Sequence, residues 1–181
     1  MLRAFFTAIG IASLKSDAME NSMNPRLPMS APGKMPVAAV EIAAEASLLL
    51  AQARNAAFAE VQCGRVGLGL GVLQQALEQE PMSHELLSDM AALLLATGEL
   101  QQAVAYASQA LVQRPGHGPS LYTLAFAQSG LGELQTARMT LTDLLSEGAS
   151  LSSLRDEAPC LEPVARTELA RLFALERKPQ P

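Results

Sequence analysis

The sequence predicts an all-α protein, and both its composition and a repeated pattern point to this fold class. Alanine and leucine dominate the 49% of residues that are hydrophobic, whereas aromatic residues make up 4% and tryptophan is absent. Ala and Leu favour helices, while strands favour β-branched and aromatic residues. The 181 residues are enough for one domain with a buried core. Small residues also recur at a constant interval, which indicates a repeated helical unit.

Residues 1–36 are expected to be a leader and linker outside the folded domain. An apolar run from Ala4 to Leu14 has the character of a weak signal segment, but Lys15 separates it from the small residues that would follow. The run is too short to cross a bilayer, which takes about 20 apolar residues. A start at an internal methionine and a disordered leader are the alternatives. Four prolines within residues 19–36 predict a linker there, whichever of these alternatives holds for the residues before it.

The domain is predicted to begin with a helix over residues 37–49. No Pro or Gly separates this segment from the residues that follow. It is therefore expected either to lengthen the first helix of the repeated region or to form a separate amphipathic arm. As an arm, it offers a surface through which two copies of the chain could form a homodimer.

The repeated pattern has an interval of 34 residues. The small residues that match at this interval are Ala57, Ala91 and Ala125; Gly64, Gly98 and Gly132; and Gly69, Ala103 and Ala137. Each interval is predicted to fold as two antiparallel helices, because a small side chain at Ala91 and at Ala103 lets two helix axes approach closely. Gly98 is expected to end the first helix in a left-handed cap, and Pro115 to stop the second.

This pattern resembles the tetratricopeptide repeat (TPR) family over residues 50–83, 84–117 and 118–151. The resemblance implies a solenoid of helical hairpins in a TPR domain that spans residues 37–181. A C-terminal capping helix is expected at about 162–178, because Glu162 and Pro163 make a suitable helix start and solenoids need a capped end. The face expected to meet the last repeat comprises Val164, Leu169, Phe173 and Leu175.

Composition argues against several function classes. The chain has 13 basic and 18 acidic residues and lacks the basic stripe that nucleic acid requires. Glycines between Gly64 and Gly71 fall on a repeat turn and a second helix, whereas a phosphate-binding loop follows a strand. Cys63 and Cys160 are widely separated and are expected to be ordinary buried or half-buried thiols.

The sequence contains no arrangement typical of an active site. His84 and His117 are expected at repeat junctions, near one edge of the solenoid, and no Cys or carboxylate cluster accompanies them as metal ligands would require. We therefore expect no enzyme activity, no metal or other cofactor and no small-molecule substrate.

The resemblance implies a concave groove that binds a peptide and is lined by the first helix of each repeat. The groove residues expected from it are Arg54, Phe58, Val61, Gln62, Glu85, Ser88, Ala92, Leu95, Tyr122, Phe126 and Ser129. Members of the family that grip a peptide carboxylate use Lys and Asn residues, which these faces lack. Phe58, Leu95 and Phe126 are instead expected to anchor an apolar or amphipathic partner segment.

Two functions are therefore expected of this non-enzymatic module. The first is a cytoplasmic chaperone or adaptor, since the size, acidity and repeat number are similar to those of type III secretion chaperones that hold hydrophobic translocator subunits in bacteria. The alternative is a periplasmic or membrane-tethered assembly factor, similar to TPR subunits of cytochrome maturation or envelope complexes. In that alternative, residues 1–18 would act as the signal or anchor.

Overall fold

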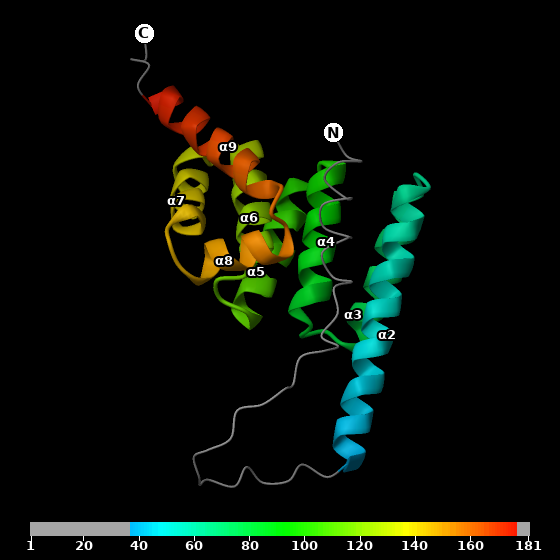
Figure 1. Cartoon of the computed structure of the whole chain (residues 1–181). Coiled ribbons are helices and arrows are strands. Elements are labelled where there is room, and N and C mark those ends of the chain that lie inside the picture. The colour runs from blue at the N-terminus through cyan, green and yellow to red at the C-terminus, as the bar shows by residue number, and fades with distance from the viewer. Residues whose placement is uncertain (1–36, 177–181) are drawn as a thin grey trace, which may run out of the picture.

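The computed structural model describes the backbone of residues 37–176 and the side chains of residue 45 and residues 47–176. The described chain is all α-helical, as the composition predicted (Figure 1). Predictions for residues 1–36 and 177–178 lie outside the described residues. The helices are α2 (Val37–Gln62), α3 (Val66–Gln79), α4 (His84–Thr97), α5 (Leu100–Gln113), α6 (Gly118–Gly130), α7 (Leu134–Leu145), α8 (Ala149–Glu157) and α9 (Leu161–Glu176).

Consecutive helices pack in pairs, and the pairs follow one another along the molecule. α2 packs on α3, α4 on α5, and α6 on α7, in each case across a short turn (Figure 1). The first helices of the pairs also contact one another in series, α2 with α4, α4 with α6, and α6 with α8. α9 completes the order by packing on α7 and α8. The second hairpin has the bounds that the 34-residue interval predicted, to within a few residues, whereas the first begins at Val37 and the third ends at Leu145.

Residues 37–49 lengthen the first helix and do not form a separate helix. α2 runs without a break over 26 residues, and its first turns project beyond the neighbouring helices (Figure 1). Leu48 and Leu49, near the middle of this helix, are 58% and 60% exposed. Although α2 is long, no helix among the described residues combines the length and apolar character needed to cross a membrane.

Small residues lie where the helices of a pair cross, as the sequence predicted. In the second and third pairs, the alanines at these crossings are completely buried: Ala91, Ala103, Ala125 and Ala137. In the first pair, glycine takes the place of alanine at Gly69. A Cβ atom there would lie 2.7 Å from Cγ2 of Val61 and 2.9 Å from the carbonyl oxygen of Ala57. The closer approach of α2 and α3 therefore explains the departure from alanine at this position.

The predicted left-handed cap is confirmed at Gly98, where φ is 85° and the backbone N–H donates to carbonyl oxygens of α4. Gly64 and Gly132, at the equivalent turns, also have positive φ. Residues with side chains rarely adopt this conformation, so glycine ends each hairpin's first helix without strain. α5 ends at Gln113, just before Pro115, as predicted.

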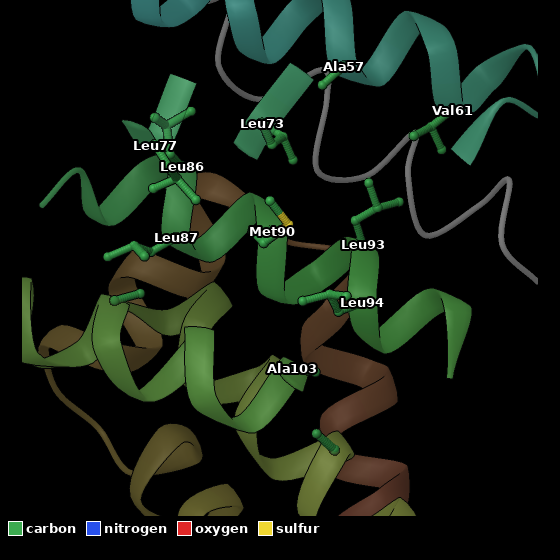
Figure 2. Packing of buried hydrophobic residues seen from close by; sticks show 12 residues of the cluster. Ala57, Val61, Leu73, Leu77, Leu86, Leu87, Met90, Leu93, Leu94 and Ala103 are labelled. Carbon is green, nitrogen blue, oxygen red and sulfur yellow. The ribbon is translucent and has the colours of Figure 1, made fainter. Parts of the chain in front are cut away.

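Two hydrophobic clusters form the interior. The first core joins α2, α3, α4 and α5, with Leu73, Leu86 and Leu93 fully buried at its centre (Figure 2). The second core joins α6, α7, α8 and α9 and includes Leu141, Leu144 and Leu154. Each core therefore spans two successive helix pairs.

The C-terminal end of the array differs from the prediction. α8 is an additional short helix that the sequence reading did not separate from the third repeat. α9 then buries Leu161, Ala165 and Leu172, whereas Val164, Phe173 and Leu175, which we expected on the buried face, are more than 40% exposed. α8 and the turn after it fix the direction from which the chain enters α9. The face of α9 that packs against the protein is therefore the one that contains its first residue, Leu161.

The prediction for the two cysteines is also wrong. Cys63 and Cys160 are both free and exposed. Cys63 directly follows the last residue of α2, and Cys160 directly precedes α9. Each thiol therefore lies in a turn between helices, where neighbouring side chains do not cover it.

Candidate interaction surface

The residues predicted to line the groove divide into three groups by exposure. Six are half-buried: Arg54, Phe58, Glu85, Leu95, Phe126 and Ser129. Gln62 is exposed, and four are buried: Val61, Ser88, Ala92 and Tyr122. The half-buried group retains surface for a partner, whereas the buried group is already covered by the protein itself.

The buried side chains correct part of the expected groove. Val61 packs in the first core, and α4 is buried at every position from Leu86 to Leu94, which includes Ser88 and Ala92. α4 contacts α2, α3, α5 and α6, so it has no wide free face. Tyr122 lies in the second core with its ring stacked on Phe126, at 4.3 Å between centroids. These side chains stabilise the array and do not form its surface.

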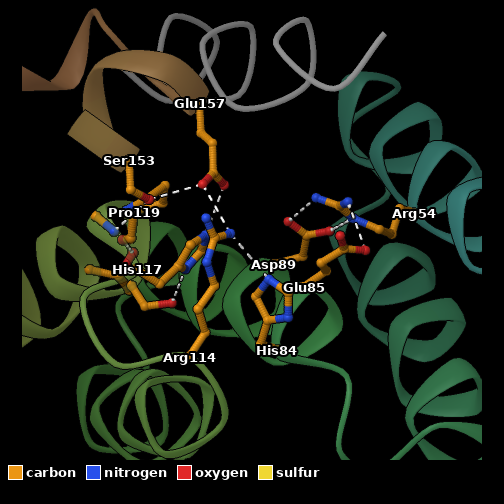
Figure 3. Close-up of polar contacts among 12 residues, drawn as sticks. Arg54, His84, Glu85, Asp89, Arg114, His117, Pro119, Ser153 and Glu157 are labelled. Atoms are coloured by element: carbon orange, nitrogen blue, oxygen red, sulfur yellow. Dashed lines mark hydrogen bonds and ion pairs between the residues drawn. The ribbon is translucent and has the colours of Figure 1, made fainter. Parts of the chain in front are cut away.

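A buried ion pair joins α2 to α4. Arg54 donates from Nε and Nη2 to the carboxylate of Asp89 and from Nη1 to Oε2 of Glu85, the last at 3.4 Å (Figure 3). The Asp89 side chain is only 3% exposed. Burial raises the pKa of Asp89, and the charge and hydrogen bonds of Arg54 oppose this rise. The structure thus brings together the predicted residues Arg54 and Glu85, with Asp89 as their buried partner.

A second polar cluster joins α6 to α8. The buried side chain of His117 contacts Oγ of Ser120 through Nδ1 at 2.7 Å and Oε2 of Glu157 through Nε2 at 2.8 Å. Ser153 Oγ accepts from the backbone N–H of Gly118 at 3.0 Å and donates to Oε1 of Glu157 at 2.9 Å. Figure 3 shows Glu157 between His117, Ser153 and Arg114.

Glu157 is the acceptor at the centre of this second cluster. Arg114 Nη1 lies 3.1 Å from Oε1 of Glu157 and also reaches His84 on α4. Burial alone would raise the pKa of Glu157, but hydrogen bonds from His117 and Ser153 and the charge of Arg114 outweigh this and lower the pKa to about 2. The carboxylate therefore stays ionised and holds its donors at neutral pH.

α9 covers part of the predicted groove in the third repeat. Ser129 donates to Oε1 of Glu168 at 2.5 Å, and Arg171 donates to Ser129 at 2.9 Å. Phe126 packs against the second core, to which α9 contributes Ala165. The surface of α6 is therefore less open to a partner than the surface of α2.

Every arginine of residues 37–176 forms an ion pair with a carboxylate. The pairs not described above are Arg65 with Glu60, Arg138 with Glu176, Arg155 and Arg166 with Glu162, and Arg171 with Glu168. These residues include 16 acidic and 7 basic side chains, so carboxylates remain in excess. This surface has no unpaired guanidinium with which to bind an anion.

Sequence reasoning missed four residues of these polar clusters: the buried Asp89 and Ser153, and the partly exposed Arg114 and Glu157. Asp89 had a usable signal, because a carboxylate inside the apolar run from Leu86 to Leu95 indicates a buried cation partner. The two histidines lie close together, with ring centroids 5.4 Å apart; their predicted position at one edge of a solenoid stays a prediction. The described residues contain no group of three or more His, Cys, Asp and Glu suited to a metal ion.

Comparison with known proteins gives no relative from which a function could be transferred. No protein-family model matches the sequence, and no curated protein is significantly similar to it. The resemblance to the tetratricopeptide repeat therefore stays a prediction based on the 34-residue interval and on the residues that recur at it.

Proposed function

We propose that this protein is a non-enzymatic interaction module of the tetratricopeptide-repeat type, which acts as a chaperone or adaptor for an apolar or amphipathic segment of a partner protein. The observation that carries this proposal is the serial contact of α2, α4 and α6, each with a half-buried apolar residue of the expected groove. These residues are Phe58, Leu95 and Phe126. Such side chains keep apolar area that a partner can cover, which favours binding by about 25 cal/mol per Å².

The TPR solenoid is part of this proposal, and three observations support it. Helix pairs recur at the predicted interval, fully buried alanines lie at equivalent crossings, and glycines with positive φ end the first helices. Repeats that stack in series create an extended surface along their first helices. A linear partner segment matches such a surface better than a compact ligand does.

The first candidate role is that of a cytoplasmic chaperone, similar to those that hold hydrophobic secreted subunits. The apolar run from Ala4 to Leu14 favours a second candidate, a periplasmic or membrane-tethered assembly factor. Intact-mass measurement of the protein purified from its native cells separates the two. A start at an internal methionine favours the chaperone role, whereas cleavage near residue 18 by a signal peptidase favours the assembly factor.

Site-specific photo-crosslinking of the full chain in its native cells tests the interaction surface. A crosslinking residue is placed singly at Phe58, Leu95 or Phe126. The matched controls are exposed apolar positions on the second helices of the three pairs, Leu68, Val112 and Met139. We expect the same partner protein to crosslink from the first set and not from the control set. Equal crosslinking from both sets, or none from the first set, would contradict the proposed surface.

Substitution then measures how much the anchors contribute. Replacing the three anchor residues by serine should weaken the purified complex by about 2 kcal/mol for each hot-spot side chain, or roughly thirtyfold per residue. Serine at the three control positions should leave affinity unchanged. Circular dichroism of both triple variants verifies that the helix content is retained. If the anchor variant keeps wild-type affinity, the binding surface lies elsewhere on the molecule.

A further inference from the structure

Both histidines of the chain lie together where α4, α5, α6 and α8 meet. His84 is the first residue of α4, and His117 directly precedes α6. Their rings meet edge to face, with centroids 5.4 Å apart and planes at 85°. Arg114, at the end of α5, and Glu157, at the end of α8, complete the group (Figure 3).

The contact between His84 and Arg114 requires a neutral imidazole. Nη1 of Arg114 lies 3.3 Å from Nε2 of His84. A guanidinium group is always charged and only donates hydrogen bonds, so Nε2 of His84 must be the acceptor. The single ring proton is then on Nδ1. Protonation of His84 would place an N–H donor opposite another donor and abolish the hydrogen bond.

His117 differs, because its contacts tolerate a charged ring. Nε2 of His117 donates to the Glu157 carboxylate, which only accepts. Nδ1 faces a serine hydroxyl, Ser120 Oγ, which can either donate or accept. A proton added to His117 therefore removes no hydrogen bond and increases its attraction to Glu157. Of the two histidines, only His84 loses a contact when it becomes charged.

Several charges surround His84, and some oppose its protonation while others favour it. Arg114 and His117 contact the ring from α5 and α6, and the N-terminus of α4 adds the positive end of a helix dipole. Glu85 on α4, which Arg54 of α2 engages, and Glu157 on α8 act in the opposite direction. Burial, His117 and Arg114 together lower the pKa of His84.

We propose that His84 is a pH-sensitive contact that holds the first turn of α4 against Arg114 while the imidazole is neutral and releases it on acidification. The α6–α8 contact through His117 and Glu157 persists over the same pH range. Acidification therefore loosens the contact between the start of α4 and the end of α5, within the second helix pair, without detaching α8. This inference concerns the conformation of the chain and does not depend on the identity of a partner.

Hydrogen exchange of the full-length protein at pH 7.5 and pH 5.5, corrected for intrinsic exchange rates, tests this proposal. Amides of residues 86–90 should exchange several-fold faster at pH 5.5, because protonation of His84, whose pKa is lowered while the contact is closed, favours the open state. Amides of residues 150–157 should not change. In the H84Q variant, the side-chain oxygen accepts from Arg114 at every pH, so the acceleration should disappear.

Proton NMR titration gives a second readout, because the chain has only two histidines to resolve. His84, assigned by its absence from H84Q, should titrate below the usual imidazole value of about 6.5. Arg114→Met should raise its midpoint, since one opposing charge is removed. The proposal is overturned if residues 86–90 exchange equally at both pH values, if H84Q retains the acceleration, or if Arg114→Met leaves the midpoint of His84 unchanged.

Discussion

At the junction of α2 with α4, long charged side chains bridge the helices, whereas at the junction of α6 with α8 the two backbones themselves approach. Arg54 reaches the buried Asp89 across the first junction. At the second, a Cβ atom on Gly118 would lie 2.6 Å from the carbonyl oxygen of Ser150 and 2.7 Å from Cα of Leu154. The same helix order is thus held by an ion pair at one end, and by close backbone packing together with the His117–Glu157 cluster at the other.

The difference shows that repeated sequence does not imply repeated junction chemistry. The alanine contacts within each pair recur at 34 residues, but the contacts between successive first helices do not. A buried charge pair is costly to break, because the remaining charge is left without a partner. A close backbone contact is instead sensitive to any added volume. The following substitutions separate these two kinds of sensitivity.

The largest effect is expected for Arg54→Met. This change leaves the carboxylate of Asp89 buried and unpaired, which should lower the free energy of unfolding by about 3–5 kcal/mol at pH 7. Because burial already raises the pKa of Asp89, loss of Arg54 should raise it further. The deficit should therefore shrink as pH falls and Asp89 becomes protonated. Urea denaturation at pH 7 and pH 5 measures both effects.

Arg65→Met is the matched control for this prediction. Arg65 also pairs with a carboxylate, that of Glu60, but its side chain is 54% exposed. Water solvates both groups when the pair is broken, so little change in stability is expected. If the two variants lose equal stability, burial of Asp89 is not the source of the effect.

Gly118→Ala tests the close contact at the other junction. The added methyl group meets backbone atoms of α8, which cannot rotate away, so α8 must shift. We expect a loss of about 1–3 kcal/mol in the free energy of unfolding. Thermal denaturation measures the loss, and exchange of amides in residues 150–157 locates it. Unchanged stability would show that α8 moves freely at this junction.

Glu157→Gln should have a smaller, pH-dependent effect, because this side chain is 38% exposed. Its pKa of about 2 lies below the usual value for Glu, so the ionised form stabilises the fold. The stabilisation is complete above about pH 4.3, the unfolded value, and is lost as pH falls towards 2. The wild type should therefore exceed the variant in stability at pH 6, and the difference should vanish near pH 2.

The smallest expected effect is a gain, for Gly71→Ala. Gly71 lies inside α3, and a Cβ atom there would meet nothing within 4 Å. Alanine should stabilise the helix by about 0.5–1 kcal/mol, because glycine loses more backbone freedom on folding. Chemical denaturation measures the gain. Gly69→Ala, two residues away, should instead destabilise the fold, and a gain there would contradict the close approach of α2 and α3.

The sequence allowed the helix pairs to be predicted because their contacts depend on local spacing. Ala91 and Ala103 recur with their equivalents, and a turn glycine such as Gly98 marks the end of a first helix wherever it appears. The buried face of α9 could not be predicted in the same way, because two apolar stripes run along that helix and its entry from α8 decides between them. The short helix α8 could not be predicted from the repeat either, because its nine residues do not follow the 34-residue spacing.

The groove was only partly predictable for a related reason. Choosing its residues requires knowing how successive pairs rotate relative to one another, and the sequence pattern within one pair does not contain that information. Val61 and Tyr122 were placed on the surface because they share a helical face with Phe58 and Phe126. In the structure, neighbouring helices cover them. Asp89 was missed because its partner lies 35 residues away on another helix.

The pairing of every arginine in residues 37–176 has a consequence for behaviour in salt. With the seven cations already engaged, the nine excess carboxylates mainly repel one another across the surface. The Debye length is about 10 Å at 0.1 M ionic strength and about 3 Å at 1 M, so added salt screens this long-range repulsion more than it weakens the short ion pairs. The folded array should therefore gain stability with ionic strength, as proteins from saline environments do when their surfaces are acidic.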